Sequence, residues 1–276
     1  MNSIILICLD NFQSYIIDNV KQLLLLDYNI TIIITDNLTN YFTDINGIKI
    51  VKTSELDDYG YNSRSNLDKN FRGGFWRLAS QRLFYLYSYM KKENITNCFH
   101  IENDVMIYNN IEIPDKTKIW LVMDSENRCI PGILFIPSFD KITPLITNYI
   151  YDKNDMENLA YFYKNNKNIC EKFPIINTDD NFTRLNTIFD GAAIGQYLGG
   201  VDSRNTPGDT RGFINETCIV NYSKYKFIWK FDGLYKPYII INDRDIPVSN
   251  LHIHSKNLYR FNSVKPEETK LIPIYN

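Results

Sequence analysis

Apolar positions in the first fifty residues form short continuous runs separated by a helix-spaced set. Residues 3–9 and 30–34 are runs of strand length, typical of strands that are buried on both faces of a parallel sheet. Between them, apolar side chains recur on one side of a helical pattern, at Phe12, Tyr15, Ile16, Val20, Leu23 and Leu24. A shorter apolar run follows at 48–51. This order predicts a right-handed βαβ unit.

The next segment changes from polar loop to helix and then to a strand with an acidic end. Residues 53–70 are mostly polar and predict a long exposed loop. Residues 74–91 have apolar side chains at helical spacing and predict a helix. The strand predicted at Cys98–Ile101 runs into residues 102–104 (END), and residues 105–108 continue in extended form.

The remaining pattern predicts a helix at 156–163 and another that opens after Asp190 and stops at Gly199 and Gly200. Further strands are predicted at 119–123, 132–136, 225–230, 238–242 and 248–254. No internal repeat or linker is visible, so we expect one domain over residues 1–276. Its predicted class is α/β, with a mixed, mainly parallel central sheet flanked by helices. Ligands of such sheets bind beyond the carboxyl ends of the strands.

Composition narrows the partners and the compartment. The net charge is −2 without a long basic run, so we expect no nucleic acid partner, because duplex binding needs a Lys/Arg face. Five widely spaced cysteines without a C-x-x-C pair indicate reduced thiols and a cytoplasmic protein, in the host cytoplasm if the source is viral. We expect no signal peptide, because the apolar start has neither a basic n-region nor a small-residue cleavage site. We expect no integral membrane segment, because no apolar stretch approaches about 20 residues.

The acidic end of the predicted strand at 98–101 is the first candidate for chemistry. Glu102 and Asp104 are two positions apart, so on an extended chain both carboxylates point the same way. Two carboxylates at a strand end form a site of hard oxygen ligands that suits Mg²⁺ or Mn²⁺ together with substrate phosphates. The alternative is a solvated acidic turn.

A second candidate lies near the C-terminus, in the stretch NLHIHSKNL. His252 and His254 are also two positions apart on a predicted strand, and either imidazole can complete a metal site begun by the carboxylates. Lys256 follows, and its charge can neutralise a diphosphate. The alternatives are core or surface histidines and an exposed lysine.

In their order along the chain, the motifs E102-N-D104 and H252-I-H254 resemble those of the GT-A glycosyltransferases. Stretches such as FDGAAIGQYLGG and LHIHSKN are similar to uncharacterised glycosyltransferases of bacteria and large DNA viruses. The resemblance implies a GT-A-like (Rossmann-like) domain in which the acidic pair and a late histidine hold Mn²⁺ or Mg²⁺ between the donor phosphates. It implies a nucleotide-sugar-binding half at 1–110, an acceptor-side half at 111–262 and a tail at 263–276. Glu102 departs from the usual first Asp, which leaves open whether it contacts the metal or the ribose.

The resemblance also implies roles for three further positions. Arg77, one helix before the acidic pair, would contact phosphate or sugar hydroxyls, unless it is a helix-surface arginine, the interpretation we give to Arg72 and Arg82. Asp190 would contact the donor sugar or act as the base of an inverting enzyme; its alternative is to cap a helix. Asp36 would bind the ribose or the base.

The polar stretch at 202–216 either lines the acceptor site or is an ordinary surface loop.

The function implied by this resemblance is metal-dependent transfer of a sugar, most often from a UDP-sugar, to a glycan or glycoconjugate. One alternative is a non-catalytic sugar- or nucleotide-binding protein on the same scaffold. Another is a nucleotidyltransferase, which would usually carry a glycine-rich loop with a basic residue after the first strand, where this chain has LDNFQSY. A metal-dependent nuclease is disfavoured by the missing basic face.

Overall fold

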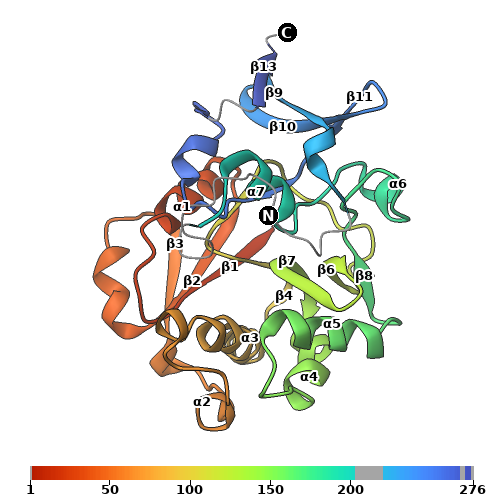
Figure 1. Cartoon of the computed structure of the whole chain (residues 1–276). Helices are drawn as coiled ribbons and strands as arrows, with labels where there is room; N and C mark the ends of the chain where they lie inside the picture. The colour runs from red at the N-terminus through yellow and green to blue at the C-terminus, as the bar shows by residue number, and fades with distance from the viewer. Residues whose placement is uncertain (1, 203–219, 268–270, 275–276) are drawn as a thin grey trace.

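The computed structural model describes residues 2–202, 220–267 and the backbone of 271–274. Its centre is a seven-stranded sheet with the order β3-β2-β1-β4-β7-β6-β8 (Figure 1). The strands are β1 Ser3–Cys8, β2 Asn29–Ile34, β3 Ile48–Lys52, β4 Thr96–Ile101, β6 Ile119–Ser125, β7 Arg128–Ser138 and β8 Cys170–Lys172. They are mostly apolar and buried, because helices cover both faces of the sheet.

Strand β7 is the single antiparallel member of this sheet. It pairs antiparallel with β4 and β6, whereas all other neighbouring pairs are parallel. The predicted mixed, mainly parallel sheet of the α/β class is thereby confirmed. Strands β1, β2, β3 and β4 run in one direction, so their carboxyl ends meet at one edge of the sheet.

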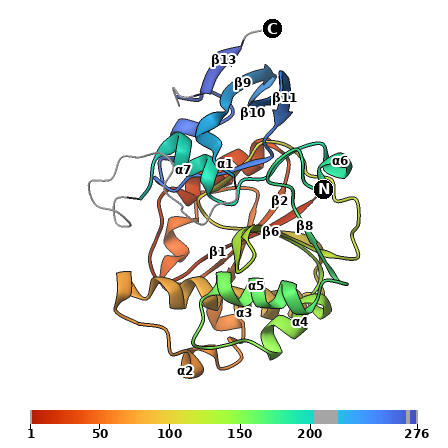
Figure 2. The same ribbon diagram turned by 45° about the vertical axis from the view of Figure 1, so that its right-hand side comes forward.

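Helices cover both faces of the sheet (Figures 1 and 2). One face carries α3 Phe75–Lys92, α4 Phe139–Thr147 and α5 Asp155–Asn165, whose apolar side chains form one core cluster. The other face carries α1 Ile16–Leu25 and α7 Ala193–Gly199, within a second core cluster. The helices predicted at 74–91 and 156–163 correspond to α3 and α5. Two short helices, α2 Tyr61–Arg64 and α6 Phe182–Leu185, lie in connections.

A smaller four-stranded sheet, with the order β11-β10-β9-β13, lies beyond α1 and α7 (Figure 1). Its strands are β9 Lys226–Asp232, β10 Leu234–Ile241, β11 Arg244–Pro247 and β13 Leu271–Ile274. Trp229 of β9 packs edge-on against Tyr108, with ring centroids 5.7 Å apart, so this sheet shares the core of the α1 face. The pairing of β13 with β9 also places part of the C-terminal tail in a strand.

The segment predicted as an exposed loop at 53–70 is partly buried instead. Tyr61 is fully buried and packs on Phe84 of α3 at a centroid distance of 4.7 Å and on Tyr149 at 5.9 Å. The prediction was wrong here because polar neighbours on both sides of Tyr61 hide a single aromatic anchor. The pattern also missed α4, which contains Pro144, and the short strands β8 and β11.

Within the described part of the chain, no helix has both the length and the apolar character needed to cross a bilayer.

Candidate metal centre at the carboxyl edge of the sheet

The acidic pair lies directly after β4, in the tight turn that connects it to β5 (Val105–Ile107). The backbone N–H of Glu102 donates to the carbonyl of Gly132 on β7 at 3.1 Å. The N–H of Val105 donates back to the Glu102 carbonyl at 3.0 Å, which closes the turn. Both acidic side chains are therefore fixed at the edge where the carboxyl ends of β1, β2, β3 and β4 meet.

A short strand pair brings a histidine to the same place. Strand β12 (Asn250–His252) runs antiparallel to β5, with His252 opposite Val105. The next residue, Ile253, donates its N–H to the carbonyl of Asp104 at 2.8 Å. Cross-strand neighbours on one face lie within side-chain reach, so this register delivers the imidazole beside the acidic turn.

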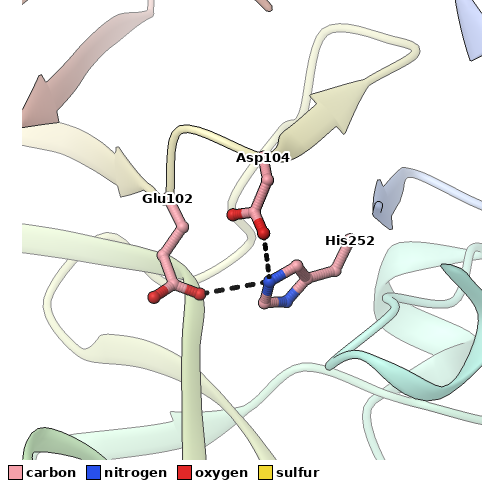
Figure 3. Close-up of side chains that lie close together, drawn as sticks. All are labelled: Glu102, Asp104 and His252. Carbon is pink, nitrogen blue, oxygen red and sulfur yellow. Dashed lines mark hydrogen bonds and ion pairs between the residues drawn. The ribbon is translucent and has the colours of Figure 1, made fainter. Parts of the chain in front are cut away.

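Glu102, Asp104 and His252 converge (Figure 3). His252 Nε2 lies 3.2 Å from Asp104 Oδ2 and 3.4 Å from Glu102 Oε2. One ligand atom from each residue lies within 4.8 Å of the others, and no other such group occurs among the described residues. Two carboxylate oxygens and one imidazole nitrogen are a donor set that suits Mn²⁺ or Mg²⁺, with room for water and phosphate ligands.

The other ring nitrogen of His252 supports this interpretation. Nδ1 lies 2.7 Å from the carbonyl of Gly191, so Nδ1 carries the proton that it donates. In the neutral ring, the lone pair of Nε2 then faces two carboxylates, an arrangement that needs a cation or a second proton between them. A backbone carbonyl that fixes the imidazole tautomer in this way is usual for histidine ligands of metals. The residues thus fit a bound divalent ion.

Two cationic side chains flank the three residues. Arg82 Nη2 contacts Glu102 Oε1 at 2.6 Å and Asp155 Oδ2 at 2.9 Å. Lys256 Nζ contacts Asp104 Oδ2, the oxygen that also faces His252. Three carboxylates against two fixed cations leave one negative charge, which a metal ion or a proton on His252 neutralises.

The charges shift the pKa values of these groups in consistent directions. Burial raises the pKa of both carboxylates, but Arg82 lowers that of Glu102 and Lys256 that of Asp104, so that both lie below their usual values. Burial also opposes the charged form of His252, yet Asp104 and Glu102 raise its pKa to about 9. The site therefore attracts positive charge strongly.

The structure corrects the interpretation of two arginines as helix-surface residues. The Arg82 side chain is only 12% exposed and bridges Glu102 and Asp155. Arg72 lies before α3, where its guanidinium is 3.6 Å from Asp202 and stacks over the ring of Phe75. The interpretation was wrong because carboxylates from other elements cover both side chains, and the pattern of one helix does not reveal such partners.

Asp190 is fully buried and accepts three backbone hydrogen bonds. Its Oδ1 accepts from Ile194 at 2.9 Å, and its Oδ2 accepts from Gly195 at 2.8 Å and from His252 at 2.9 Å. Helix α7 begins at Ala193, so Asp190 caps its first turn from three positions upstream. Burial raises the pKa of Asp190, whereas these N–H groups oppose the rise. The carboxylate thus ties α7 to the backbone of His252.

The other expected site residues lie outside the three-residue group. The His254 ring packs beside that of His252, with centroids 4.9 Å apart, and Gln196 Nε2 lies 3.4 Å from its Nε2. Asp36 follows β2 at the same sheet edge, is exposed, and accepts from the Ser54 hydroxyl at 2.6 Å.

Arg77 Nη2 donates to the Asn62 carbonyl at 3.3 Å. Of the polar stretch at 202–216, the residues from 203 onward lie outside the described ranges.

The sequence analysis did not identify the groups that fix the three converging residues: Arg82, Asp155 and the carbonyl of Gly191. One signal for Arg82 was available. It lies four positions after Leu78 and four before Leu86, on the apolar face of α3, where an arginine needs a buried partner. Asp155 and Gly191 carry no such signal.

No protein-family model matches the sequence, and a comparison with curated proteins finds no significant match. Among solved structures, the chain is similar to one described as the PaToxG glycosyltransferase, with 11% identity, a TM-score of 0.39, and 60% of this chain and 69% of that one covered. It is also similar to the glycosyltransferase GlyE of Streptococcus pneumoniae TIGR4, with 9% identity and a TM-score of 0.42 over 62% of this chain. The aligned part spans only 45% of the GlyE chain.

Proposed function

We propose that this chain is a metal-dependent glycosyltransferase that moves a sugar from a nucleotide-sugar to a glycan or glycoconjugate. The observation that carries the proposal is the convergence of Glu102, Asp104 and His252 at the carboxyl edge of a mainly parallel sheet. This edge is where ligands of open α/β sheets bind. A metal site with two carboxylates and one imidazole leaves coordination positions for the phosphates of a substrate.

When bound, Mn²⁺ or Mg²⁺ would supply Lewis-acid chemistry that stabilises the negative charge of a departing diphosphate. Glu102, Asp104 and His252 would hold the ion, and the Gly191 carbonyl fixes the ring proton of His252 on Nδ1, which leaves the lone pair of Nε2 as the donor. Lys256 places a positive charge beside the same site, and its ammonium would contact a phosphate oxygen in exchange for Asp104.

The nucleotide would lie over the carboxyl ends of β1 and β2. Asp36 is exposed at the end of β2, and hydrogen bonds from Ser54 hold its pKa below the usual value, so it stays an acceptor for ribose hydroxyls or a uracil N–H. We propose UDP as the nucleotide because the GT-A glycosyltransferases that the motifs resemble most often use it, and the Asp36 carboxylate is compatible with this choice. Arg77, at the start of α3, is the candidate for a contact to phosphate or sugar hydroxyls.

For Asp190 we propose action through His252. Its carboxylate accepts from the backbone N–H groups of Ile194, Gly195 and His252, and His252 is one of the proposed metal ligands. A general base has to reach the acceptor hydroxyl, and a fully buried carboxylate that is bonded in this way has to break its cap to do so. The sugar contact expected from the resemblance stays a prediction.

The decisive experiment measures thermal unfolding with UDP, GDP, and their sugar conjugates, each with and without Mn²⁺. A ligand at one hundred times its dissociation constant stabilises the folded state by about 2.7 kcal/mol, which is readily measured. We expect a shift with a UDP-sugar that requires Mn²⁺. Slow release of free sugar from the bound donor, followed by chromatography, then tests for catalysis.

Three outcomes distinguish the alternatives. Metal-dependent binding with release of sugar and nucleoside diphosphate supports the glycosyltransferase. Binding without turnover, with or without candidate acceptors, supports a non-catalytic nucleotide-sugar-binding protein. Formation of pyrophosphate from a nucleoside triphosphate and a sugar phosphate supports a nucleotidyltransferase. No shift with any nucleotide, using folded protein, overturns the proposal.

A further inference from the structure

Arg82 connects three elements of the fold at the metal centre. It projects from α3, and its Nη2 contacts Glu102 after β4 and Asp155 at the first turn of α5. Its Nε donates to the carbonyl of Ala79 at 2.9 Å, which fixes the plane of the guanidinium against its own helix. The side chain thus has one orientation that satisfies all of these acceptors at once.

The two carboxylate oxygens of Glu102 have different partners. Oε1 accepts from Arg82 at 2.6 Å, whereas Oε2 faces His252 Nε2 at 3.4 Å. A free glutamate side chain rotates about three bonds, so fixing it in one rotamer costs conformational entropy that a favourable contact has to offset. Arg82 supplies this partner, so a single oxygen of Glu102 is presented to the ion.

Asp155 in turn fixes Arg82. Its side chain is only 2% exposed, its Oδ1 accepts from the N–H of Met156 at 3.0 Å, and its Oδ2 accepts from Arg82. The first turn of α5 is held by a capping box between Asn154 and Glu157, so the carboxylate stands on a rigid base. The chain of contacts therefore runs from α5 through Arg82 to a proposed metal ligand.

We propose that Arg82, anchored by Asp155, is a positioning residue that sets the metal affinity of the centre by fixing Glu102. The inference rests on the proposed function, because it takes the three converging residues as metal ligands. The competing explanation is a purely structural ion pair that joins α3, β4 and α5. That explanation predicts a loss of stability but no change in metal affinity of the folded protein.

The test measures Mn²⁺ binding to the full chain, with the electron paramagnetic resonance signal of free Mn²⁺ as the readout. Loss of a partner that orients a metal ligand typically weakens metal binding about 10- to 100-fold, and we expect this loss in Arg82→Gln. Arg82→Lys keeps the charge but not the planar guanidinium, and we expect an intermediate loss. Arg128→Gln is the matched control, because it removes an arginine that is paired with a buried aspartate, Asp124, which is not one of the three proposed ligands.

A double-mutant comparison separates positioning from general charge effects. In a Glu102→Gln background the residue that Arg82 positions is already changed, so we expect Arg82→Gln to add less than about twofold there. An equal loss in both backgrounds means that Arg82 acts through its charge or through the fold, and overturns the inference. Unchanged or tighter Mn²⁺ binding by folded Arg82→Gln overturns it as well.

Two further readouts keep the test decisive. If Arg82→Gln does not fold, Asp155→Asn removes the anchor alone, and we expect a loss of Mn²⁺ affinity of up to about tenfold. Unchanged affinity in Asp155→Asn then overturns the inference. If the wild-type chain does not bind Mn²⁺ at all, the metal centre itself is refuted. If the wild type binds Mn²⁺ and the variants bind it equally well, only the role of Arg82 is refuted.

Discussion

His252 Nε2 lies 3.2 Å from Asp104 Oδ2, although 148 positions separate the two residues in the sequence. The pairing of β12 with β5 produces this contact, because it places His252 opposite the residue that follows Asp104. The backbone bond from Ile253 to the Asp104 carbonyl locks the same register. A one-residue slip would turn the imidazole to the other face of the strand, so the site depends on this short ladder.

Asp104→Asn tests the centre directly. The amide keeps the size of the side chain but removes the charge, so we expect Mn²⁺ affinity to fall at least about 100-fold, more than for loss of an orienting partner. Metal-dependent sugar transfer should be abolished with it. Calorimetric Mn²⁺ titration measures the effect, and Asp124→Asn, a buried aspartate paired with Arg128, is the matched control. Full Mn²⁺ affinity in Asp104→Asn would remove Asp104 from the ligand set.

Lys256→Met should have the opposite effect on the metal. The ammonium contacts Asp104 Oδ2, the oxygen that faces His252, and therefore competes with an ion for it. We expect Mn²⁺ to bind the nucleotide-free variant on the order of tenfold more tightly, because the charge that is removed occupies the proposed ligand oxygen itself, whereas Arg82 contacts the oxygen of Glu102 that does not face His252. Nucleoside diphosphate binding should weaken.

Lys230→Met is the control for Lys256→Met, since Lys230 pairs with Asp245 at a similar exposure of 28% against 25%. Weaker Mn²⁺ binding by Lys256→Met would show that the lysine supports the metal site rather than competing for it.

Asp190→Ala is expected to destabilise the fold by about 3 to 5 kcal/mol, because three buried N–H groups lose their acceptor. Urea denaturation followed by circular dichroism measures the free energy of unfolding. Asp36→Ala, at an exposed position, should cost less than about 1 kcal/mol. A stability of Asp190→Ala close to that of wild type, with activity lost, would instead favour a direct role of Asp190 in the reaction.

Much of the central sheet is predictable because its signals are local. The runs at 3–9, 30–34 and 98–101 are mostly apolar on both faces, as expected of strands in a sheet that is covered on both sides. Strand β7 reads much like them, and its antiparallel direction follows from the short turn after β6, which no apolar pattern encodes. Strand β8 has three residues and a single buried one, too few for any period to appear.

The three converging residues were predictable from the sequence, whereas the residues that fix them in place were not. Glu102, Asp104 and His252 stand out because an acidic pair after an apolar strand is combined with one of only three histidines in the chain on a later predicted strand. The choice between His252 and His254 depends on which imidazole faces the acidic turn, and that is set by the register of β12 against β5. Asp155 lies near the site only because α5 packs beside α3, and the local sequence around Asp155 does not reveal that packing.

The cysteines give a prediction for thiol chemistry. Cys8, Cys98, Cys129 and Cys170 are buried and free, and burial raises the pKa of Cys8 to about 11 and that of Cys98 to about 12. Cys218 lies outside the described residues, so the test uses a Cys218→Ser variant that retains only these four cysteines. We expect a thiol reagent at pH 8 to react at least about 100-fold more slowly with the native variant than with the urea-unfolded variant. Absorbance of the released chromophore gives both rates. Rapid reaction of one native thiol would show that its segment opens readily.

In Gly195→Ala, helix propensity and packing have opposite expected effects on stability. Alanine favours a helix interior over glycine by about 1 kcal/mol, so propensity alone predicts a more stable α7. A Cβ on Gly195, however, would lie 1.9 Å from the carbonyl oxygen of His252, which is backbone and has no rotamer to change. We expect a net loss of stability of about 2 to 4 kcal/mol and, because α7 must move away from β12, weaker Mn²⁺ binding.

Gly199→Ala in the same helix is the comparison that decides between propensity and packing. The nearest atoms to its Cβ would belong to the side chains of Phe261 and Ser255, at 3.1 to 3.2 Å, which is a much longer distance than in Gly195 and involves no backbone atom. We therefore expect Gly199→Ala to cost less than about 1 kcal/mol and to leave Mn²⁺ affinity within about twofold of wild type. Equal effects of the two substitutions would mean that close contact between α7 and the His252 backbone does not hold the ligand in place.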